Sequence, residues 1–271
     1  MNHIQISIEA NEELQEILIS ELAELGAVGF EQTATHLLAY FEEQNFRSYD
    51  VNLLLKDYTF YFTTLPEQNW NALWESNFEP VVVDEFCAIR AEFHEPIKTV
   101  QHEIIITPKM SFGTGHHATT YMMVEQMRGI DFTNKKVFDF GTGTGILAIL
   151  ASKLGATSVT AIDIDEWSIQ NAEENFQKNN IQTVNLYQSS ILPIERFDII
   201  LANINRNVLV QYASTLVNIL SPKGMLLVSG LLKDDEKIIV EVFNELVLQN
   251  TQQKQTWVSI LFTTKYNSYV I

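Results

Sequence analysis

The chain of 271 residues is predicted to fold as a doubly wound, mostly parallel α/β sheet preceded by a smaller α+β domain. From Ile104 onward, short apolar and β-branched runs alternate regularly with helical runs, a pattern typical of a parallel sheet covered by helices on both faces. One strand-to-helix junction in this region is rich in glycine, as nucleotide-binding junctions are. The preceding part of the chain contains shorter runs and most of the acidic side chains.

The first domain is predicted to be a small α+β sandwich of the ferredoxin-like type. Alternating polar and apolar residues at 3–8 predict a half-buried strand, and leucine and isoleucine at helical spacing predict a helix over 12–25, before Gly26. Aromatic and β-branched runs predict three more strands, and a polar stretch around 50–56 is weakly helical. These strands are expected at 28–32, 37–42 and 59–64.

An aromatic repeat follows the first domain. Trp70, Trp74 and Phe78 recur every four residues before Pro80, which predicts three aromatic side chains on one helix face. Packing is the simpler interpretation, and contact with a substrate is the alternative.

One or two strands within 81–93 are expected to bridge to the second domain. We place the boundary between Glu95 and His102, so that the predicted domains are 1–98 and 99–271.

The second domain is predicted to alternate strands and helices. Strands are expected at 136–140, 158–162, 184–187, 197–202 and 225–229. Helices are expected at 145–154, 166–178, 208–220 and 235–246. A last strand at 257–265 is expected to pair antiparallel with the segment before it.

The composition indicates a soluble, globular protein of the cytoplasm. The chain is 46% hydrophobic but has no uninterrupted apolar stretch of about eighteen residues, and its first residues do not resemble a secretion signal. Cys87 is the only cysteine, so an intramolecular disulfide or a cysteine metal cluster is excluded. We expect Cys87 to be a small buried residue, and we expect no membrane attachment.

Acidic residues are concentrated in the first third of the chain. Residues 1–95 contain 18 Asp and Glu against 3 Lys and Arg, a net charge of −15, whereas residues 96–271 contain 16 against 14, a net charge of −2. Such a surface repels nucleic acid and attracts basic partners. Solubility alone is an equally good explanation of the charge.

The glycine-rich junction predicts a nucleotide cofactor. Gly141, Gly143 and Gly145 follow an apolar strand, where glycine lets the backbone turn sharply and approach a ligand with which any Cβ would collide. Asp163 lies about twenty residues later, where a carboxylate can accept hydrogen bonds from ribose hydroxyls. The spacing is GxGxG, one residue shorter than the dinucleotide pattern GxGxxG. It therefore favours S-adenosylmethionine, a ribose-bearing cofactor without pyrophosphate, although an ordinary strand-turn-helix junction is the alternative.

Two further segments are expected at the same edge of the sheet. The hydroxyl-rich loop 111–120 leads into a helix, where backbone amides and the Thr119 and Thr120 hydroxyls could hold the carboxylate of an amino acid moiety. The adjacent His116 and His117 lack a third ligand, so no metal site is predicted.

Asn203 follows the apolar strand 197–202, where its side chain would point into the crevice. Its oxygen could accept a hydrogen bond from a neutral amine, and a turn-forming role is the alternative. The polar residues 188–190, after another strand, could meet an adenine edge.

Together these segments resemble the bacterial ribosomal protein L11 methyltransferase family. The resemblance rests on FGTGHHATT, DFGTGTG, AIDID, ANI after a buried strand, and SGLLKDD, all within residues 100–271, and on the aromatic pattern upstream. FGTGHHATT is the specific element, because DxGxGxG is shared by many class I methyltransferases.

The resemblance implies an N-terminal substrate-recognition domain joined to a class I, Rossmann-like methyltransferase domain. It implies a monomer that methylates lysine side chains, and the N-terminal amine, of the basic ribosomal protein L11, without direct contact to nucleic acid. The cofactor contacts that it implies are at Thr120, Gly141, Gly143, Gly145, Asp163 and Asn203, with Gly113, Thr114, Gly115 and His116 in a loop over the cofactor.

Two segments depart from the family pattern. Residues 109–111 are more basic than usual, and Arg206 stands in a stretch that is usually neutral, which leaves the approach of the target amine open.

Methyl transfer to an amine needs a neutral nucleophile and little acid–base chemistry. Deprotonating a lysine of pKa about 10.4 at pH 7 costs about 4 to 5 kcal/mol, which desolvation can lower. We therefore expect Asn203 to orient the amine, and not to act as a general base.

Three alternatives remain. A nicotinamide-dependent oxidoreductase is disfavoured by the glycine spacing. A methyltransferase for nucleic acid, another protein or a small molecule is the second alternative. The acidity argues against nucleic acid, and the absence of Pro-Pro-Tyr after Asn203 argues against base or amide nitrogens as acceptors. A non-catalytic ribosome-assembly factor would have no use for a cofactor loop.

Overall fold

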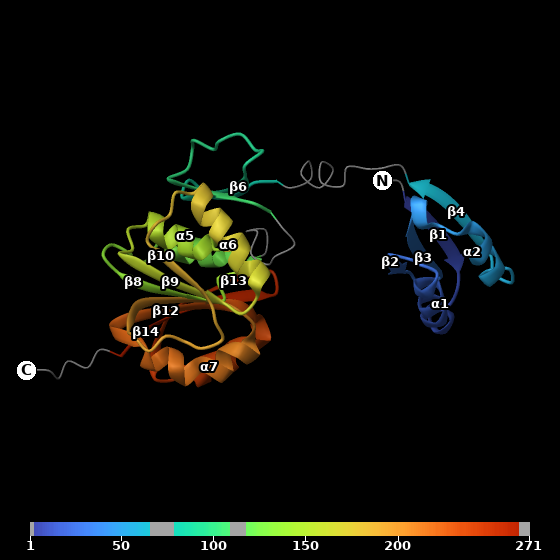
Figure 1. Ribbon diagram of the computed structural model, residues 1–271. Helices are drawn as coiled ribbons and strands as arrows, with labels where there is room; N and C mark the ends of the chain where they lie inside the picture. Colours follow the sequence, from blue (N-terminus) through green and yellow to red (C-terminus); the bar gives the residue numbers. More distant parts are fainter. Residues whose placement is uncertain (1–2, 66–78, 109–117, 266–271) are drawn as a thin grey trace, which may run out of the picture. The chain divides into compact units, whose positions relative to one another are not determined.

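The computed structural model describes residues 3–65, 79–108 and 118–265, and the chain divides into two compact units (Figure 1). The first unit comprises Met1–Asn77 and the second Phe78–Ile271. The aromatic repeat at Trp70, Trp74 and Phe78 lies outside the described residues.

The first unit has the element order β1 α1 β2 β3 α2 β4, with a short 3-10 turn before α2. Its four strands form an antiparallel sheet of order β2-β3-β1-β4, which is the split βαβ arrangement of the ferredoxin-like fold. The predicted fold of this unit is therefore confirmed. The elements are β1 (His3–Glu9), α1 (Glu12–Glu24), β2 (Gly29–Gln32), β3 (His36–Glu42), α2 (Ser48–Leu54) and β4 (Phe60–Leu65).

Strand alternation builds the core of the first unit. Ile4, Ile6 and Ile8 project from one face of β1 and are buried, and Leu18 and Leu22 of α1 are fully buried with them. The helix begins where the Asn11 side chain accepts a hydrogen bond from the Leu14 amide. This unit thus has a hydrophobic core of its own.

The structure places the unit boundary earlier than the sequence analysis does. Residues 78–98 belong to the second unit, because β5 (Val81–Val83) and β6 (Cys87–Ala91) form a three-stranded sheet with β7 (His102–Ile106). Apolar side chains of this sheet are buried in the same cluster as the helices of the second unit. Cys87 is buried there, as expected, and burial raises the pKa of its thiol to about 12.

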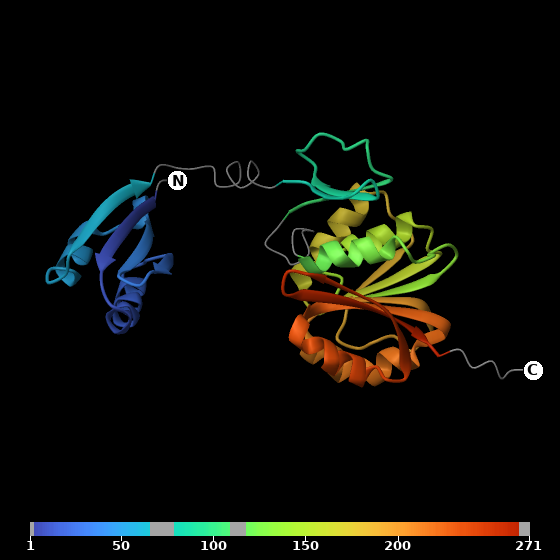
Figure 2. The same cartoon turned by 180° about the vertical axis from the view of Figure 1, so that it is seen from behind.

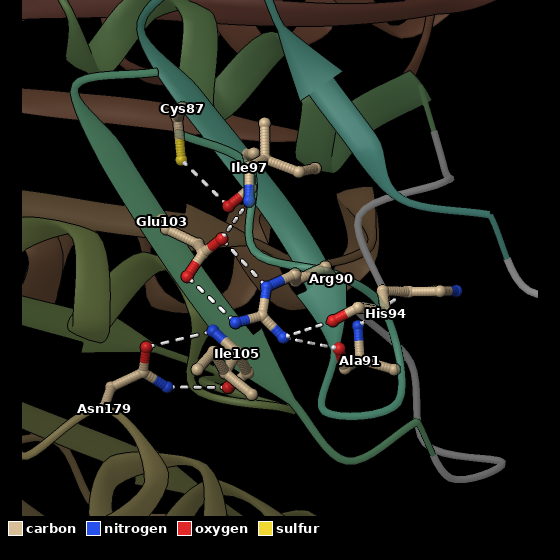
Figure 3. A network of polar contacts seen from close by, with 9 residues as sticks. Cys87, Arg90, Ala91, His94, Ile97, Glu103, Ile105 and Asn179 are labelled. Atoms are coloured by element: carbon tan, nitrogen blue, oxygen red, sulfur yellow. Dashed lines mark hydrogen bonds and ion pairs between the residues drawn. The ribbon is translucent and has the colours of Figure 1, made fainter. Parts of the chain in front are cut away.

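One buried ion pair fixes the small sheet (Figure 3). Arg90 of β6 donates from Nε and Nη2 to the two carboxylate oxygens of Glu103 on β7, at 2.8 and 3.0 Å. Glu103 also accepts from the Ile97 amide at 2.7 Å, and these donors lower the pKa of its carboxyl. The guanidinium donates further to the Ala91 and His94 carbonyls, so the charge is buried with its hydrogen bonds satisfied.

The second unit is organised around a seven-stranded sheet of order β10-β9-β8-β11-β12-β14-β13. Pairings from β10 to β12 are parallel and the last two are antiparallel, which confirms the doubly wound, mostly parallel prediction. The strands are β8 (Lys136–Phe140), β9 (Ser158–Asp163), β10 (Val184–Gln188), β11 (Phe197–Asn203), β12 (Leu220–Leu232), β13 (Leu246–Lys254) and β14 (Trp257–Thr264).

Helices cover both faces of this sheet (Figure 2). Helices α4, α5 and α6 pack with the small sheet on one face, and α7 and α8 pack on the other. They comprise α4 (Ala118–Met127), α5 (Ile146–Lys153), α6 (Glu166–Lys178), α7 (Arg206–Asn218) and α8 (Glu236–Val242). None of the helices in the described segments combines the length and apolar character that a membrane crossing requires.

Two predicted elements have different lengths in the structure. Strand β12 begins at Leu220 because this residue already pairs with Phe197 of β11, so α7 ends before it. Helix α8 ends at Val242, since Leu246 pairs with Thr264 as the first residue of β13.

Candidate functional site

The candidate site lies where the strand order of the large sheet reverses. Strands β9 and β10 follow β8 on one side, and β11 and β12 lie on its other side, so the loops after β8 and β11 diverge and leave a crevice. A small hollow, partly open to solvent, occupies this position. It is lined by Thr120, Gly141, Thr142, Gly143, Thr144, Ile146, Leu147 and Asn203.

The glycine loop turns sharply between β8 and α5. Gly141, Gly143 and Gly145 have φ values of +75°, +52° and +80°, a region that favours glycine. The Gly141 and Thr142 amides both donate to the Ile162 carbonyl at 2.9 Å, which ties the loop to β9. The predicted sharp turn is therefore confirmed.

Protein atoms occupy the space beside two of these glycines. A Cβ on Gly141 would lie 2.4 Å from Cγ2 of Ile204, and a Cβ on Gly145 would lie 2.6 Å from Cε1 of Phe176. The sequence analysis attributes the missing side chains to close approach of a ligand. At Gly141 and Gly145 the predicted reason is wrong, because the side chains of Ile204 and Phe176 fill the space that a ligand was expected to occupy.

Asp139, the last residue but one of β8, stabilises the loop from below. Its side chain is fully buried and its Oδ2 accepts from the Thr142 hydroxyl at 2.6 Å. Burial raises the pKa of Asp139 to about 7, although the Thr142 hydrogen bond acts in the opposite direction.

Asp163 lies at the end of β9, next to the glycine loop. Its Oδ2 accepts from the Gly143 amide at 2.9 Å and its Oδ1 accepts from the Asp165 amide at 3.0 Å. Each oxygen has a second lone pair, so the carboxylate is held in place and can still accept hydrogen bonds.

Asn203 ends β11 and faces Thr120 of α4. The Asn203 Nδ2 donates to the Thr120 Oγ1 at 3.2 Å, whereas the buried Oδ1 has no hydrogen-bond partner among the described residues. An unpaired buried acceptor is costly. Its position in the wall of the hollow indicates that a donor from a bound molecule belongs there.

Ile204 fixes the direction in which the chain leaves β11. Its side chain packs against Gly141, and its backbone lies against Gly230 of β12, where a Cβ would be 2.3 Å from the Ile204 carbonyl oxygen. The Ile204 amide donates to the Ser229 carbonyl at 3.2 Å. Two glycines on neighbouring strands therefore set the place of the preceding Asn203.

The structure brings together five of the predicted site residues. Thr120, Gly141, Gly143 and Asn203 line the hollow, and Asp163 is hydrogen-bonded to its glycine loop. Gly145 caps α5 without lining the hollow. Gly113, Thr114, Gly115 and His116 lie outside the described residues.

Other suggested residues lie off the hollow. Thr119 is fully buried and is not part of the lining. The segment 188–190 lies near Asp163, because the Ser189 amide donates a hydrogen bond to the Asp163 carbonyl. This segment does not line the hollow either.

The sequence analysis did not single out the apolar wall formed by Ile146 and Leu147, although both directly follow the glycine motif. Apolar residues at the start of a helix are indistinguishable from core residues in the sequence. Only their placement beside the glycine loop identifies them.

Arg206 has a structural partner. Its Nη1 donates to Asp235 Oδ1 at 2.9 Å, and Asp235 Oδ2 accepts from the Leu232 amide at 3.0 Å. The guanidinium therefore joins the start of α7 to the turn after β12.

Comparisons with known proteins identify relatives over most of the chain. The family described as ribosomal protein L11 methyltransferase (PrmA) matches residues 31–265. A ribosomal protein L11 methyltransferase of Porphyromonas gingivalis is 40% identical over 261 residues, covering 92% of this chain and 90% of that protein. One of Chlorobaculum tepidum is 34% identical over 282 residues, covering 97% of each.

Among solved structures, the crystal structure of a ribosomal protein L11 methylase from Lactobacillus delbrueckii subsp. bulgaricus aligns with a TM-score of 0.65 and 30% identity. The alignment covers 70% of this chain and 100% of that one.

Proposed function

The chain belongs to the ribosomal protein L11 methyltransferase family, and we propose that it methylates lysine side chains and the N-terminal amine of L11. It is an S-adenosylmethionine-dependent protein methyltransferase that acts on this ribosomal protein. The observation that carries the proposed site is the Asn203 Oδ1 atom, which is buried beside the glycine loop and has no hydrogen-bond partner in the part of the chain that the structure describes.

The residues of the hollow fit S-adenosylmethionine. Gly141 to Gly145 would pass under the cofactor, and Asp163, held by the Gly143 and Asp165 amides, would accept hydrogen bonds from the ribose hydroxyls. Thr120 and Asn203 would contact the amino acid end, opposite the apolar wall of Ile146 and Leu147. When bound, the cofactor supplies a methyl group that is electrophilic because its sulfur is a sulfonium.

The proposed role of Asn203 is to orient the target amine. Its Nδ2 is engaged by Thr120, so the amide plane is fixed and Oδ1 is left to accept a hydrogen bond from a neutral amine. That hydrogen bond directs the nitrogen lone pair away from Asn203, toward the reacting carbon. Oδ1 of an amide is too weakly basic to remove the proton, so water receives it after the lysine has been desolvated.

The test is methylation of L11 by wild-type protein and by Asn203→Ala. We expect the variant to lower kcat about a hundredfold, the scale of removing one preorganised hydrogen-bonding group, with a much smaller change in S-adenosylmethionine Kd. Asn185→Ala, exposed on β10 and off the hollow, is the control and should keep wild-type kcat. An Asn203 variant with wild-type kcat contradicts the assigned role.

Mass spectrometry of the methylated L11 tests the proposed acceptors. Methyl groups are expected on lysine side chains and on the N-terminal amine. Methylation confined to other side chains would exclude the proposed acceptors while leaving the methyltransferase activity intact.

We further propose that the first unit recognises the substrate. Residues 1–77 contain 13 Asp and Glu against 2 Lys and Arg, a net charge of −11, whereas residues 78–271 have a net charge of −6. A basic ribosomal protein would be attracted to the more acidic unit, and nucleic acid would be repelled. We also propose that the protein is cytoplasmic, as its relatives' ribosomal substrate suggests, and that it acts as a monomer.

A further inference from the structure

Helix α6 presents an unusual row of buried amides. Asn171 and Asn175 of the helix and Asn179, its C-terminal cap residue, follow one another at intervals of four residues and are only 0%, 0% and 8% exposed. A buried amide is costly unless it is hydrogen-bonded, so each of these side chains needs partners from outside its own helix turn.

Two of the three asparagines hold the free edge of the small sheet. Asn179 accepts from the Ile105 amide at 3.0 Å and donates to the Ile105 carbonyl at 2.6 Å, as a neighbouring strand would (Figure 3). Asn175 Oδ1 accepts from the Thr107 amide at 2.7 Å. These bonds satisfy the edge of β7 and explain why α6 carries amides where a core helix usually carries leucine.

Asn175 has a second partner that Asn179 lacks. Its Nδ2 donates to the Thr144 carbonyl, in the glycine loop, at 2.8 Å. Thr144 lines the hollow, whereas Asn175 does not. The next residue of α6, Phe176, packs where a Cβ of Gly145 would be, so α6 contacts the loop at two successive positions.

The Thr144 carbonyl needs such a constraint for a physical reason. The peptide between Thr144 and Gly145 is followed by a glycine with φ of +80°, and glycine adopts positive and negative φ with similar ease. Within the loop, the Gly145 amide of this peptide donates to the Thr142 carbonyl at 2.8 Å, whereas the Thr144 carbonyl faces α6 and accepts from Asn175. The hydrogen bond from Asn175 selects the orientation that gives the loop its observed shape.

We propose that Asn175 is a positioning residue for S-adenosylmethionine binding, because it fixes the Thr144–Gly145 peptide of the glycine loop and ties that loop to the end of β7. This inference rests on the proposed location of the cofactor in the hollow. Asn175 does not line the hollow, so the affinity for the cofactor would also depend on a residue outside it.

The experiment compares Asn175→Asp with Asn179→Asp in the full chain. Aspartate is isosteric and keeps an acceptor for the β7 amide, but it has no donor. The first variant loses the donor bonds to the Thr144 carbonyl and to Asn171 Oδ1. The second loses the donor bonds to the Ile105 carbonyl and to the Asn175 carbonyl. The two substitutions are therefore matched in burial, helix and chemistry.

We expect Asn175→Asp to raise the Kd for S-adenosylmethionine about tenfold or more, measured by calorimetric titration, and Asn179→Asp to change it less than about threefold. The Kd for S-adenosylhomocysteine should rise by the same factor, because the loop and not the sulfonium is affected. At saturating cofactor, kcat of Asn175→Asp should stay within a few-fold of the wild type, whereas the KM for the cofactor rises.

Equal Kd changes in the two variants would overturn the proposal, because they would indicate a purely structural role for both asparagines. The pair Asn175→Ala and Asn179→Ala, which buries no charge, gives the same comparison if an aspartate variant does not fold. Wild-type protein that fails to bind the cofactor would instead contradict the proposed function.

Discussion

At the residue scale, the position of Asn203 depends on two glycines, one in the loop after β8 and one in β12. Gly141 and Gly230 leave space on either side of Ile204, which directly follows Asn203 in the chain. Because Gly230 faces backbone atoms of Ile204, a side chain there cannot be accommodated by a rotamer change. The end of β11 must move instead.

Gly230→Ala is therefore expected to lower kcat at least about tenfold by displacing Asn203, since misplacing a reacting group by about 1 Å can cost a hundredfold. Methylation kinetics with L11 measure the effect. Gly26→Ala is the matched control, because Gly26 also has a positive φ, +94°, but a Cβ there meets nothing within 4 Å. The control should lose about 1 kcal/mol of stability and keep its kcat. Equal losses of kcat in both variants would contradict the role of Ile204.

Asp139 makes stability depend on pH. Its pKa of about 7 in the folded chain lies above the ordinary value of 3.8, so between these values the folded state binds more protons than the unfolded state. The contribution of this group to stability is therefore largest in acid and falls as the pH rises from about 4 to 7. The cause is the free-energy cost of burying the carboxylate once Asp139 has lost its proton.

Asp139→Asn should remove this dependence, because the amide keeps an acceptor for the Thr142 hydroxyl and never ionises. Relative to the wild type, the free energy of unfolding of the variant should rise by a few kcal/mol between pH 4 and pH 8, at about 1.36 kcal/mol per pKa unit. Denaturant titrations at several pH values measure it. Asp131→Asn is the control. The Thr133 amide lowers the pKa of that exposed carboxyl, so the difference in unfolding free energy between this variant and the wild type should change with pH in the opposite direction. A difference between Asp139→Asn and wild type that does not vary with pH would rule out the assigned titration.

At the element scale, each unit contains a helix with the same type of cap. Asn11 caps α1 by accepting from the Leu14 amide at 3.0 Å, and Asn205 caps α7 by accepting from the Val208 amide at 3.1 Å. The two caps are alike in geometry but belong to separate hydrophobic cores. They can therefore report on the two units independently.

Asn205→Ala is expected to destabilise the second unit by about 1 kcal/mol, and Asn11→Ala to destabilise the first unit by a similar amount. Hydrogen exchange, followed unit by unit, measures both. Each substitution should accelerate exchange in its own unit and leave the other unchanged. Acceleration of both units by one substitution would show that the units unfold together.

At the scale of the whole molecule, the unequal charge of the two units is the feature that bears on substrate recruitment. The structure assigns residues 78–98 to the second unit, so the net charge of the first is −14 over the predicted range 1–98 and −11 over residues 1–77. The first unit remains the more acidic of the two. Electrostatic attraction of this kind acts at a distance and is screened by salt.

Reversing the exposed Glu9, Glu21 and Glu24 to lysine should raise the KM for L11 at least about tenfold at low ionic strength and leave the cofactor Kd unchanged. The effect should largely disappear at about 1 M salt, where the Debye length is about 3 Å. Reversal of Glu173, Glu241 and Glu245 in the second unit changes the net charge equally and serves as the control. Unchanged kinetics at low salt in the first variant would contradict recruitment by the first unit.

The sequence alone predicted much of the architecture, because its signals are local. Alternation in β1, helical spacing with an asparagine cap in α1, and glycines at the end of β8 are each readable within about ten residues. The expected strands and helices of the second unit were found close to their predicted bounds, including α6 at 166–178. Gly141, Gly143 and Asn203 were predicted from the same kind of local pattern.

Only the tertiary structure decided how distant segments meet. Gly141 and Gly230 face the same Ile204 from two strands, Asn175 joins the glycine loop to β7, and residues 78–98 pack into the second unit. The sequence does not encode these contacts at any fixed spacing, since they depend on the order of strands in the sheet. Local preferences determine which elements form, whereas burial and hydrogen bonding between elements determine which side chains share a site.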